Sequence, residues 1–137
     1  MNRITDKINE IEQYLTELAD IVPQTFEEYS SDNLSKAACE RYFEKVIEAV
    51  TDLAFLVIAK NKFKVPEDDI DAFKILSEKK IISEELCKKL KDAKGMRNIL
   101  AHQYGKVEDN QVFDAITEQL DNDVKQFIKE VKGSLNL

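Results

Sequence analysis

Apolar residues recur at helical spacing along most of the chain. The first such run extends from about Ile4 to Val22, with Glu and Asp between the apolar positions. Pro23 lacks a backbone N–H group and is expected to end this helix. The polar segment from Gln24 to Asn33 predicts a loop or a short turn that leads into a helix cap.

The second predicted helix is the longest, from about Leu34 to Asn61, and it is apolar on more than one side. A helix of this kind is central and contacts neighbours on several faces. Pro66 predicts the start of a short helix that ends near Lys79. Ser83 is the predicted N-cap of a fourth helix, which continues to about His102. Gly95 lies inside that helix and either permits close approach of another backbone or is simply tolerated.

The last predicted helix starts near Asp109 or Asn110 and carries an apolar stripe from Val112 to Val131. Gly133 is expected to stop it. The connections are short, and the sequence contains no alternating apolar and polar strand of useful length. The pattern therefore predicts an all-α fold, an up-and-down bundle of four to five helices in a single domain over residues 1–137.

Composition agrees with a globular chain, since 43% of the residues are hydrophobic and 34% are charged. Cys39 and Cys87 have no CxxC spacing and no second histidine to complete a zinc site, so both are expected to be buried free thiols. The first residues lack the apolar segment of a signal peptide, and the apolar run Leu53 to Ala59 is too short to span a bilayer. We therefore expect a cytoplasmic protein that does not bind membranes.

The net charge of -7 argues against broad binding of nucleic acid, but the charge is unevenly placed. From Lys88 to Lys106 there are six cations and one anion, a net charge of +5 that leaves -12 on the rest of the chain. A basic patch on an acidic body can bind a phosphate backbone locally. A solvated helix face explains the same charges, and charge alone favours that explanation.

The sequence has no phosphate-binding glycine loop, no GxSxG elbow and no HExxH motif, and His102 is its single histidine. Acid–base chemistry near neutral pH is thereby narrowed to very few groups. Arg97 lies five residues before His102, and two such residues differ by about 140° around an ideal helix. Either the helix ends near His102, as Gly105 suggests, or the group converges with a partner chain.

If the chain cleaves RNA without a metal ion, this chemistry favours the second option, convergence with a partner chain. It needs a base for the 2′-hydroxyl proton, an acid for the leaving oxygen and a cation over the phosphate. One chain supplies one histidine, whereas a twofold dimer supplies two histidines and two arginines in one cleft. The single histidine therefore predicts a homodimer, and no cofactor is expected.

A known family carries the same motif. Arg97, His102 and Tyr104 match a motif of Arg, four residues, His, any residue and Tyr, and Asn98 is the usual residue after the arginine. The stretches 41–52 and 73–86 also resemble the family's helices. The chain from about 4 to 131 thus resembles the HEPN superfamily and, within it, the HepT-like toxins of toxin–antitoxin pairs.

The resemblance implies a helical bundle that dimerises around the motif and cleaves RNA as a metal-independent endoribonuclease toxin of a type II-like or type VII-like pair. It implies a cognate minimal nucleotidyltransferase antitoxin that silences the toxin by adding AMP groups to Tyr104. In this interpretation Arg97 stabilises the scissile phosphate and His102 is the acid–base group. Asn98 positions RNA or supports the motif, and Lys94 belongs to a basic stretch that guides the RNA backbone.

Glu48 and Asp52 lie four residues apart on one face of the central helix. Asp52 is expected to face Arg97 and orient it, although a solvated or purely structural pair explains the two residues equally well. Two other functions remain open for the chain. The first alternative is a non-catalytic subunit that binds a nucleotide or a nucleotidyltransferase partner through the same cleft. The second is a plain structural helical dimer.

Overall fold

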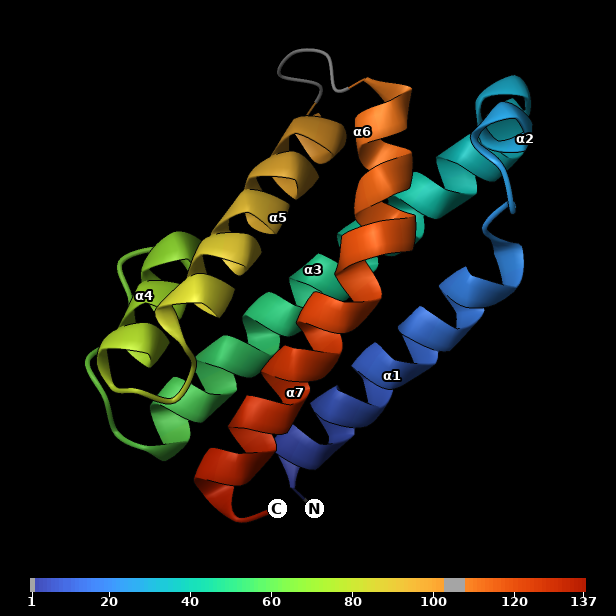
Figure 1. Cartoon of the computed structure of the whole chain (residues 1–137). Helices are drawn as coiled ribbons and strands as arrows, with labels where there is room; N and C mark the ends of the chain where they lie inside the picture. The colour runs from blue at the N-terminus through green and yellow to red at the C-terminus, as the bar shows by residue number, and fades with distance from the viewer. Residues whose placement is uncertain (1, 103–107) are drawn as a thin grey trace.

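The computed structural model describes residues 2–102 and 108–137, which form a bundle of helices (Figure 1). α1 (Arg3–Ile21) and α3 (Asn33–Lys60) lie side by side and run in opposite directions. α5 (Glu84–His102) contacts both α3 and α7 (Asp121–Leu135), and it runs antiparallel to α7. The described residues contain no strand, so the prediction of an all-α helical bundle is confirmed.

Helices α1 and α3 follow the apolar pattern closely. The predicted limits of α1 and α3 are each within one residue of the observed limits. The side chain of Asn2 accepts a hydrogen bond from the Ile4 N–H at 2.9 Å and caps α1. The stripe that α1 buries consists of Ile4, Ile8, Ile11, Leu15 and Leu18. α3 is about 42 Å long and buries residues on several sides, as expected for a central helix.

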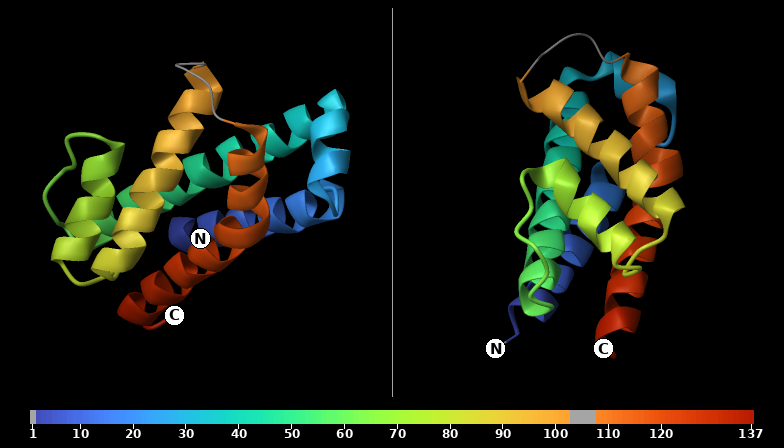
Figure 2. Two further views of the ribbon diagram at one scale, coloured as in Figure 1. Left: turned by 45° about the horizontal axis from the view of Figure 1, so that its top comes forward. Right: turned by 90° about the vertical axis from the view of Figure 1, so that its left-hand side faces the viewer.

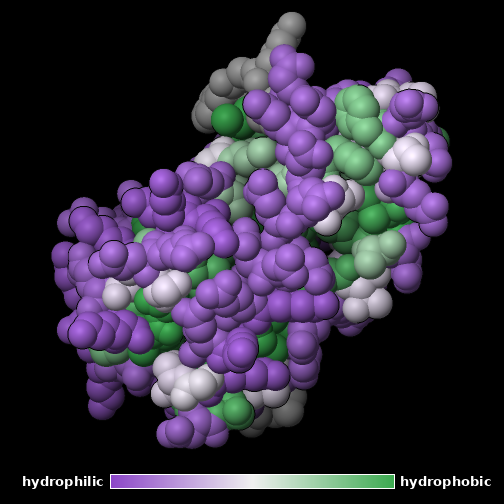
Figure 3. Space-filling view, in the orientation of Figure 1, coloured by the Kyte–Doolittle hydropathy of each residue, from purple (hydrophilic) through white to green (hydrophobic). Residues whose placement is uncertain are grey.

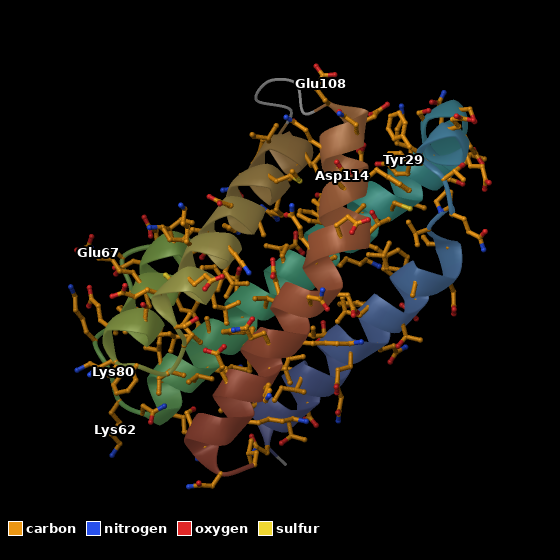
Figure 4. All side chains as sticks on the ribbon, in the orientation of Figure 1. Tyr29, Lys62, Glu67, Lys80, Glu108 and Asp114 are labelled. Carbon is orange, nitrogen blue, oxygen red and sulfur yellow. The ribbon has the colours of Figure 1, made fainter. Side chains whose placement is uncertain are left out.

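A short helix, α2 (Phe26–Ser31), occupies part of the segment predicted to be a loop or a short turn. The Thr25 side chain caps it, and Tyr29 is fully buried. Tyr29 is labelled in Figure 4, and its ring centroid lies 5.2 Å from that of Phe113 in α6 (Asp109–Asp114). A contact with a helix that is distant in the sequence therefore stabilises α2. The predicted cap is confirmed, because Asp32 caps the start of α3.

α4 (Asp69–Glu78) begins three residues later than predicted. The side chain of Asp68 accepts a backbone N–H of the first turn at 2.7 Å, so Asp68 and not Pro66 defines the start of the helix. Ser83 is confirmed as the residue that caps α5, since its hydroxyl accepts a first-turn N–H at 3.1 Å. Figure 2 shows that α2 and α4 lie at opposite ends of α3.

The last helical segment is continuous and contains a π-helical stretch. α6 (Asp109–Asp114) leads into the π-helix η1 (Ala115–Leu120), which leads into α7. The predicted start near residue 109 is confirmed, but the apolar stripe gave no sign of the change in helix type. Within η1 the Thr117 hydroxyl donates a hydrogen bond to the Phe113 carbonyl at 2.8 Å. Such bonds from a side chain to the preceding turn often accompany a local change in helix geometry.

The prediction that Gly133 stops the last helix is wrong. α7 continues to Leu135, and Asn136 ends it in the left-handed conformation with φ of 59°. Asparagine tolerates this conformation better than most residues, so it can end a helix as glycine does. Lys62 and Lys80 also have positive φ, in the turns after α3 and α4, and Figure 4 shows both at the same end of the bundle.

One hydrophobic core joins all the long helices. The rings of Phe73 in α4 and Phe127 in α7 pack edge to face across it, with centroids 6.3 Å apart. The face seen in Figure 3 is mostly hydrophilic, with small hydrophobic patches between the polar side chains. Every helix of the described residues is too short or too polar to cross a lipid bilayer.

Candidate active site

Arg97 points from α5 toward the central helix α3. Its Nη2 donates a hydrogen bond to Glu48 Oε1, and the two side chains form an ion pair. Its Nη1 donates a hydrogen bond to Asn98 Oδ1 at 3.2 Å. The Arg97 side chain is only 17% exposed. Its Nε is buried and has no hydrogen-bond partner within residues 2–102 and 108–137. The predicted catalytic arginine is thus held by one carboxylate and by the neighbouring amide of Asn98.

The prediction that Asp52 orients Arg97 is wrong, and Glu48 takes that place. Asp52 Oδ2 lies 3.5 Å from Lys7 Nζ of α1, and its side chain is 62% exposed. Glu48 and Asp52 occupy one side of α3 but lie one helical turn apart. Only Glu48 lies level with Arg97 where α5 crosses α3, while Asp52 reaches the neighbouring helix α1.

A second arginine shares the carboxylate of Glu48. Arg41 Nη1 lies 3.9 Å from Glu48 Oε1 and 3.8 Å from Glu44 Oε1, and the Arg41 side chain is 57% exposed. Arg41 was not among the site residues predicted from the sequence. Its distance of seven residues from Glu48 places the two on one side of a helix, and this spacing was the available signal.

His102 is the last residue of α5 and is exposed. Because α5 is helical from Arg97 to His102, the two side chains leave it about 140° apart. Arg97 faces α3, and His102 lies on a different face of α5.

The burial of Lys94 in the folded chain argues against its predicted role in guiding RNA. Lys94 is only 6% exposed, and its Nζ lies 2.8 Å from Asp69 Oδ2 at the start of α4. An ammonium group buried in an ion pair has little surface to offer a phosphate. Lys94 joins α5 to α4, whereas Lys88, Lys89 and Lys91 on the same helix are exposed.

Tyr104, the predicted site of AMP addition, lies outside the described residues. The neighbouring Gly105 and Lys106 lie outside them as well. The described chain resumes at Glu108, which precedes α6 (Figure 4). At the start of α6, Asp109 Oδ2 forms an ion pair with Lys36 Nζ of α3 at 2.9 Å.

A pocket of about 450 Å³ opens between α3, α5 and the π-helix. Apolar side chains, including Phe43 and Met96, line part of it, and Asp123 is one of its polar lining residues. Burial raises the pKa of Asp123, although Lys89 Nζ at 3.9 Å opposes this shift. π-Helical turns often occur near functional sites, but the pocket wall contains neither of the predicted catalytic residues.

Cys39 and Cys87 are both buried and free, which confirms the prediction for the two thiols. Burial raises the pKa of each thiol, so neither is an activated nucleophile. In the part of the chain that the structure describes, no group of three His, Cys, Asp or Glu side chains is arranged to hold a metal ion.

Sequence comparison places this helical bundle among known ribonucleases. Residues 11–131 match the family described as ribonuclease HepT-like. The chain is 28% identical over 114 residues to the tRNA nuclease HepT of Aphanizomenon flos-aquae, which covers 83% of this chain and 78% of the relative. It is also 28% identical over 90 residues to the mRNA nuclease HepT of Shewanella oneidensis, covering 66% and 67% of the two chains.

Solved structures share the fold. The tri-AMPylated HEPN toxin of Shewanella oneidensis, in complex with its MNT antitoxin, superimposes with a TM-score of 0.90 at 24% identity over 97% of this chain and 99% of that one. A toxin–antitoxin complex with AMP-PNP gives a TM-score of 0.87 at 22% identity over 95% and 97%. The fold is that of HEPN toxins. The chain belongs to the ribonuclease HepT-like family, as the resemblance in its motif implied.

Proposed function

We propose that this protein is a metal-independent endoribonuclease toxin that acts as a homodimer, with Arg97 and His102 of both copies in one cleft. The observation that carries the proposal is the placement of these residues on α5. Arg97 is held toward α3 by Glu48, and His102 is exposed on another face of the same helix. A second copy, related by a twofold axis, would bring a second histidine and a second arginine to the same cleft.

The reaction needs only the groups of the two motifs. One imidazole takes the proton of a ribose 2′-hydroxyl as its oxygen forms a bond to phosphorus. The bond from phosphorus to the 5′-oxygen breaks, and the imidazolium of the other copy protonates that oxygen. The products are a 2′,3′-cyclic phosphate and a 5′-hydroxyl. The Arg97 guanidinium stabilises the negative charge that develops on the phosphate oxygens.

The partner that we propose is a minimal nucleotidyltransferase antitoxin. The Shewanella HEPN toxin was solved with such an antitoxin and in a tri-AMPylated form, which supports the same arrangement here. The antitoxin would transfer AMP from ATP to the Tyr104 hydroxyl and release pyrophosphate. Bulky, charged AMP groups two residues after His102 would repel the RNA backbone.

The decisive experiment measures RNA cleavage in the presence of a chelator by the wild-type protein and by His102→Ala. The intact mass of each sample is checked first, because AMP on Tyr104 would mask activity. Lys125→Ala is a suitable control, since Lys125 is an exposed residue of α7 paired with Asp121 at 3.0 Å. We expect cleavage by the wild type and the control and none by His102→Ala.

Mixtures of wild type and His102→Ala test the composite cleft. If each cleft needs two histidines and the copies exchange freely, equal parts leave only about a quarter of the dimers active. A chain that works alone would retain about half of the activity at the same total concentration. Activity that falls linearly with the fraction of wild type would therefore contradict the dimeric site.

One observation favours a different function. Arg97 is mostly buried and already bound to Glu48, which is also what a structural arginine would show. The chain would then be a non-catalytic subunit that binds a nucleotide or a nucleotidyltransferase partner. Absence of cleavage by verified unmodified dimer, across several RNAs, together with intact binding to the partner, would establish that alternative.

A further inference from the structure

We infer that Arg41 is a second phosphate-binding residue of the candidate active site and contacts an RNA phosphate beside the one that Arg97 binds. The inference rests on the proposed ribonuclease function. It assigns a role to a side chain of α3 that lies outside the Arg-x4-His-x-Tyr motif. Arg41 would bind and position RNA and would take no part in proton transfer.

The position of Arg41 follows from a shared contact. Arg41 Nη1 and Arg97 Nη2 both form ion pairs with the same oxygen atom, Glu48 Oε1. The two guanidinium groups are therefore neighbours across one carboxylate, although they come from different helices. Two cations at this spacing suit the closely spaced charges of a nucleic-acid backbone.

The two arginines differ in how much of their hydrogen-bonding capacity is available. Arg97 is 17% exposed and donates to Glu48 and Asn98. Arg41 is 57% exposed, and its contacts with Glu44 and Glu48, at 3.8 Å and 3.9 Å, are longer than hydrogen bonds. Within the described residues Arg41 donates no hydrogen bond, so its planar set of N–H groups is open to a phosphate. RNA would thus meet Arg41 first.

Glu48 allows two arginine side chains to lie close together at this position. Without a carboxylate between them, two guanidinium groups would repel each other in the absence of RNA. Glu48 neutralises part of this charge and stays bound to Arg97 when Arg41 turns to the phosphate. An exposed ion pair at 3.9 Å is weak, so a phosphate with two charged oxygens can displace it at little cost.

The test measures the affinity of a short single-stranded RNA for the dimer as a function of salt concentration. The His102→Ala protein serves as the parent, since it is expected to bind RNA without cleaving it. Arg41→Gln in this parent is expected to weaken binding by about fivefold to tenfold at low salt. It should also reduce the slope of log K against log salt by about 0.7, the value for one phosphate contact on a single strand. Arg41→Lys retains the charge and should retain the slope.

Lys60→Gln is the matched control, because Lys60 is an exposed cation at the other end of α3. It should leave both the affinity and the slope unchanged. The Arg41 substitution is repeated in a Glu48→Gln background to separate direct binding from an effect through Arg97. A direct contact predicts the same loss in both backgrounds, whereas an effect relayed by Glu48 disappears when Glu48 is neutralised.

The outcomes distinguish this inference from the proposed function. If the parent binds RNA and Arg41→Gln changes neither the affinity nor the slope, Arg41 is not a phosphate contact and the ribonuclease proposal stands. A loss that vanishes in the Glu48→Gln background also overturns the inference, since Arg41 would then act only through Arg97. If the parent shows no salt-dependent binding of RNA, the proposed function and the role of Arg41 fail together.

Discussion

Glu48 accepts a hydrogen bond from Arg97, which lies 49 residues later in the chain. This contact links α5 to α3 and holds the Arg97 guanidinium beside the Glu48 carboxylate. An arginine with one carboxylate partner, one amide partner and little exposure has few orientations available. The candidate phosphate-binding group is therefore positioned before RNA arrives, which is the arrangement that electrostatic stabilisation of a transition state requires.

We expect Glu48→Gln to lower RNA cleavage by at least about tenfold, because Arg97 loses the charged partner that orients it. The free energy of unfolding should fall by about 1 kcal/mol, the value of a charge-assisted hydrogen bond that is partly open to water. Cleavage assays and urea denaturation of the same samples measure the two effects.

Asp52→Asn is the matched control, since Asp52 lies one turn along α3 and contacts Lys7 in an exposed ion pair. It should change stability by less than about 0.5 kcal/mol and leave cleavage unchanged. Faster cleavage by Glu48→Gln would contradict the orienting role and would mean that Glu48 competes with RNA for Arg97.

The ion pair of Lys94 and Asp69 predicts an unequal effect of removing either partner. Asp69→Asn leaves a buried ammonium without its carboxylate, so we expect a loss of about 1–2 kcal/mol in the free energy of unfolding. Lys94→Met replaces the long side chain by an apolar one of similar shape and should cost less than about 1 kcal/mol.

Urea denaturation of both variants measures this difference, and RNA binding provides a second measurement. Lys94→Met should leave the salt dependence of RNA binding unchanged, because the Lys94 ammonium is buried against α4. A reduced salt slope for Lys94→Met would support Lys94 as an RNA contact. A greater loss of stability in Lys94→Met than in Asp69→Asn would contradict the expected cost of leaving the Lys94 ammonium without its carboxylate.

The long helices were predictable from the sequence because each signal there is local. Apolar residues at helical spacing predicted the limits of α1 and α3 to within one residue, and Ser83 predicted the start of α5. α2 was missed because its six residues depend on Tyr29 packing against Phe113, and this contact joins segments that are far apart in the sequence. The end of α7 was misplaced because asparagine at position 136 adopts a conformation usually taken by glycine.

The candidate site was predictable only in part, for a related reason. The motif predicted Arg97, Asn98 and His102 because it depends only on the spacing of residues in the sequence. The choice between Glu48 and Asp52 depends on where α5 crosses α3, and the two carboxylates are only about 6 Å apart along the helix axis. Helix pattern alone does not fix a crossing point to that accuracy, since it defines which face of a helix is buried but leaves its position along the neighbour open.

Substitution of Gly95 by alanine tests whether another backbone approaches α5 near the Arg97 motif. A Cβ atom added at Gly95 would meet nothing within 4 Å in the described chain, and the same holds for Gly133 in α7. Each change to alanine should raise the free energy of unfolding by about 0.5–1 kcal/mol, because alanine restricts the unfolded chain and favours the helix.

Urea denaturation measures the stability of the two variants, and an RNA cleavage assay follows their activity. We expect both variants to cleave RNA like the wild type. If Gly95→Ala alone lowers cleavage or weakens the dimer while Gly133→Ala does not, a second copy packs closely against this part of α5.

Asp123 gives a prediction for the pH dependence of stability. Burial raises the pKa of Asp123 above its ordinary value of 3.8, so the folded chain holds this proton more tightly than the unfolded chain. The stabilising contribution of Asp123 is fully present below pH 3.8 and is lost as the pH rises through the pKa that Asp123 has in the folded chain. At neutral pH the half-buried carboxylate therefore costs stability, and Lys89 at 3.9 Å only partly offsets this cost.

Asp123→Asn removes the charge and should be more stable than the wild type at pH 7, with a difference that shrinks as the pH falls toward 3.8. Urea denaturation at several pH values measures this difference. Asp121→Asn is the control, since Asp121 is exposed and pairs with Lys125 at 3.0 Å, and it should change stability by less than about 0.5 kcal/mol at pH 7. A difference for Asp123→Asn that stays constant or grows toward low pH would mean that Lys89 stabilises the carboxylate more than burial opposes it.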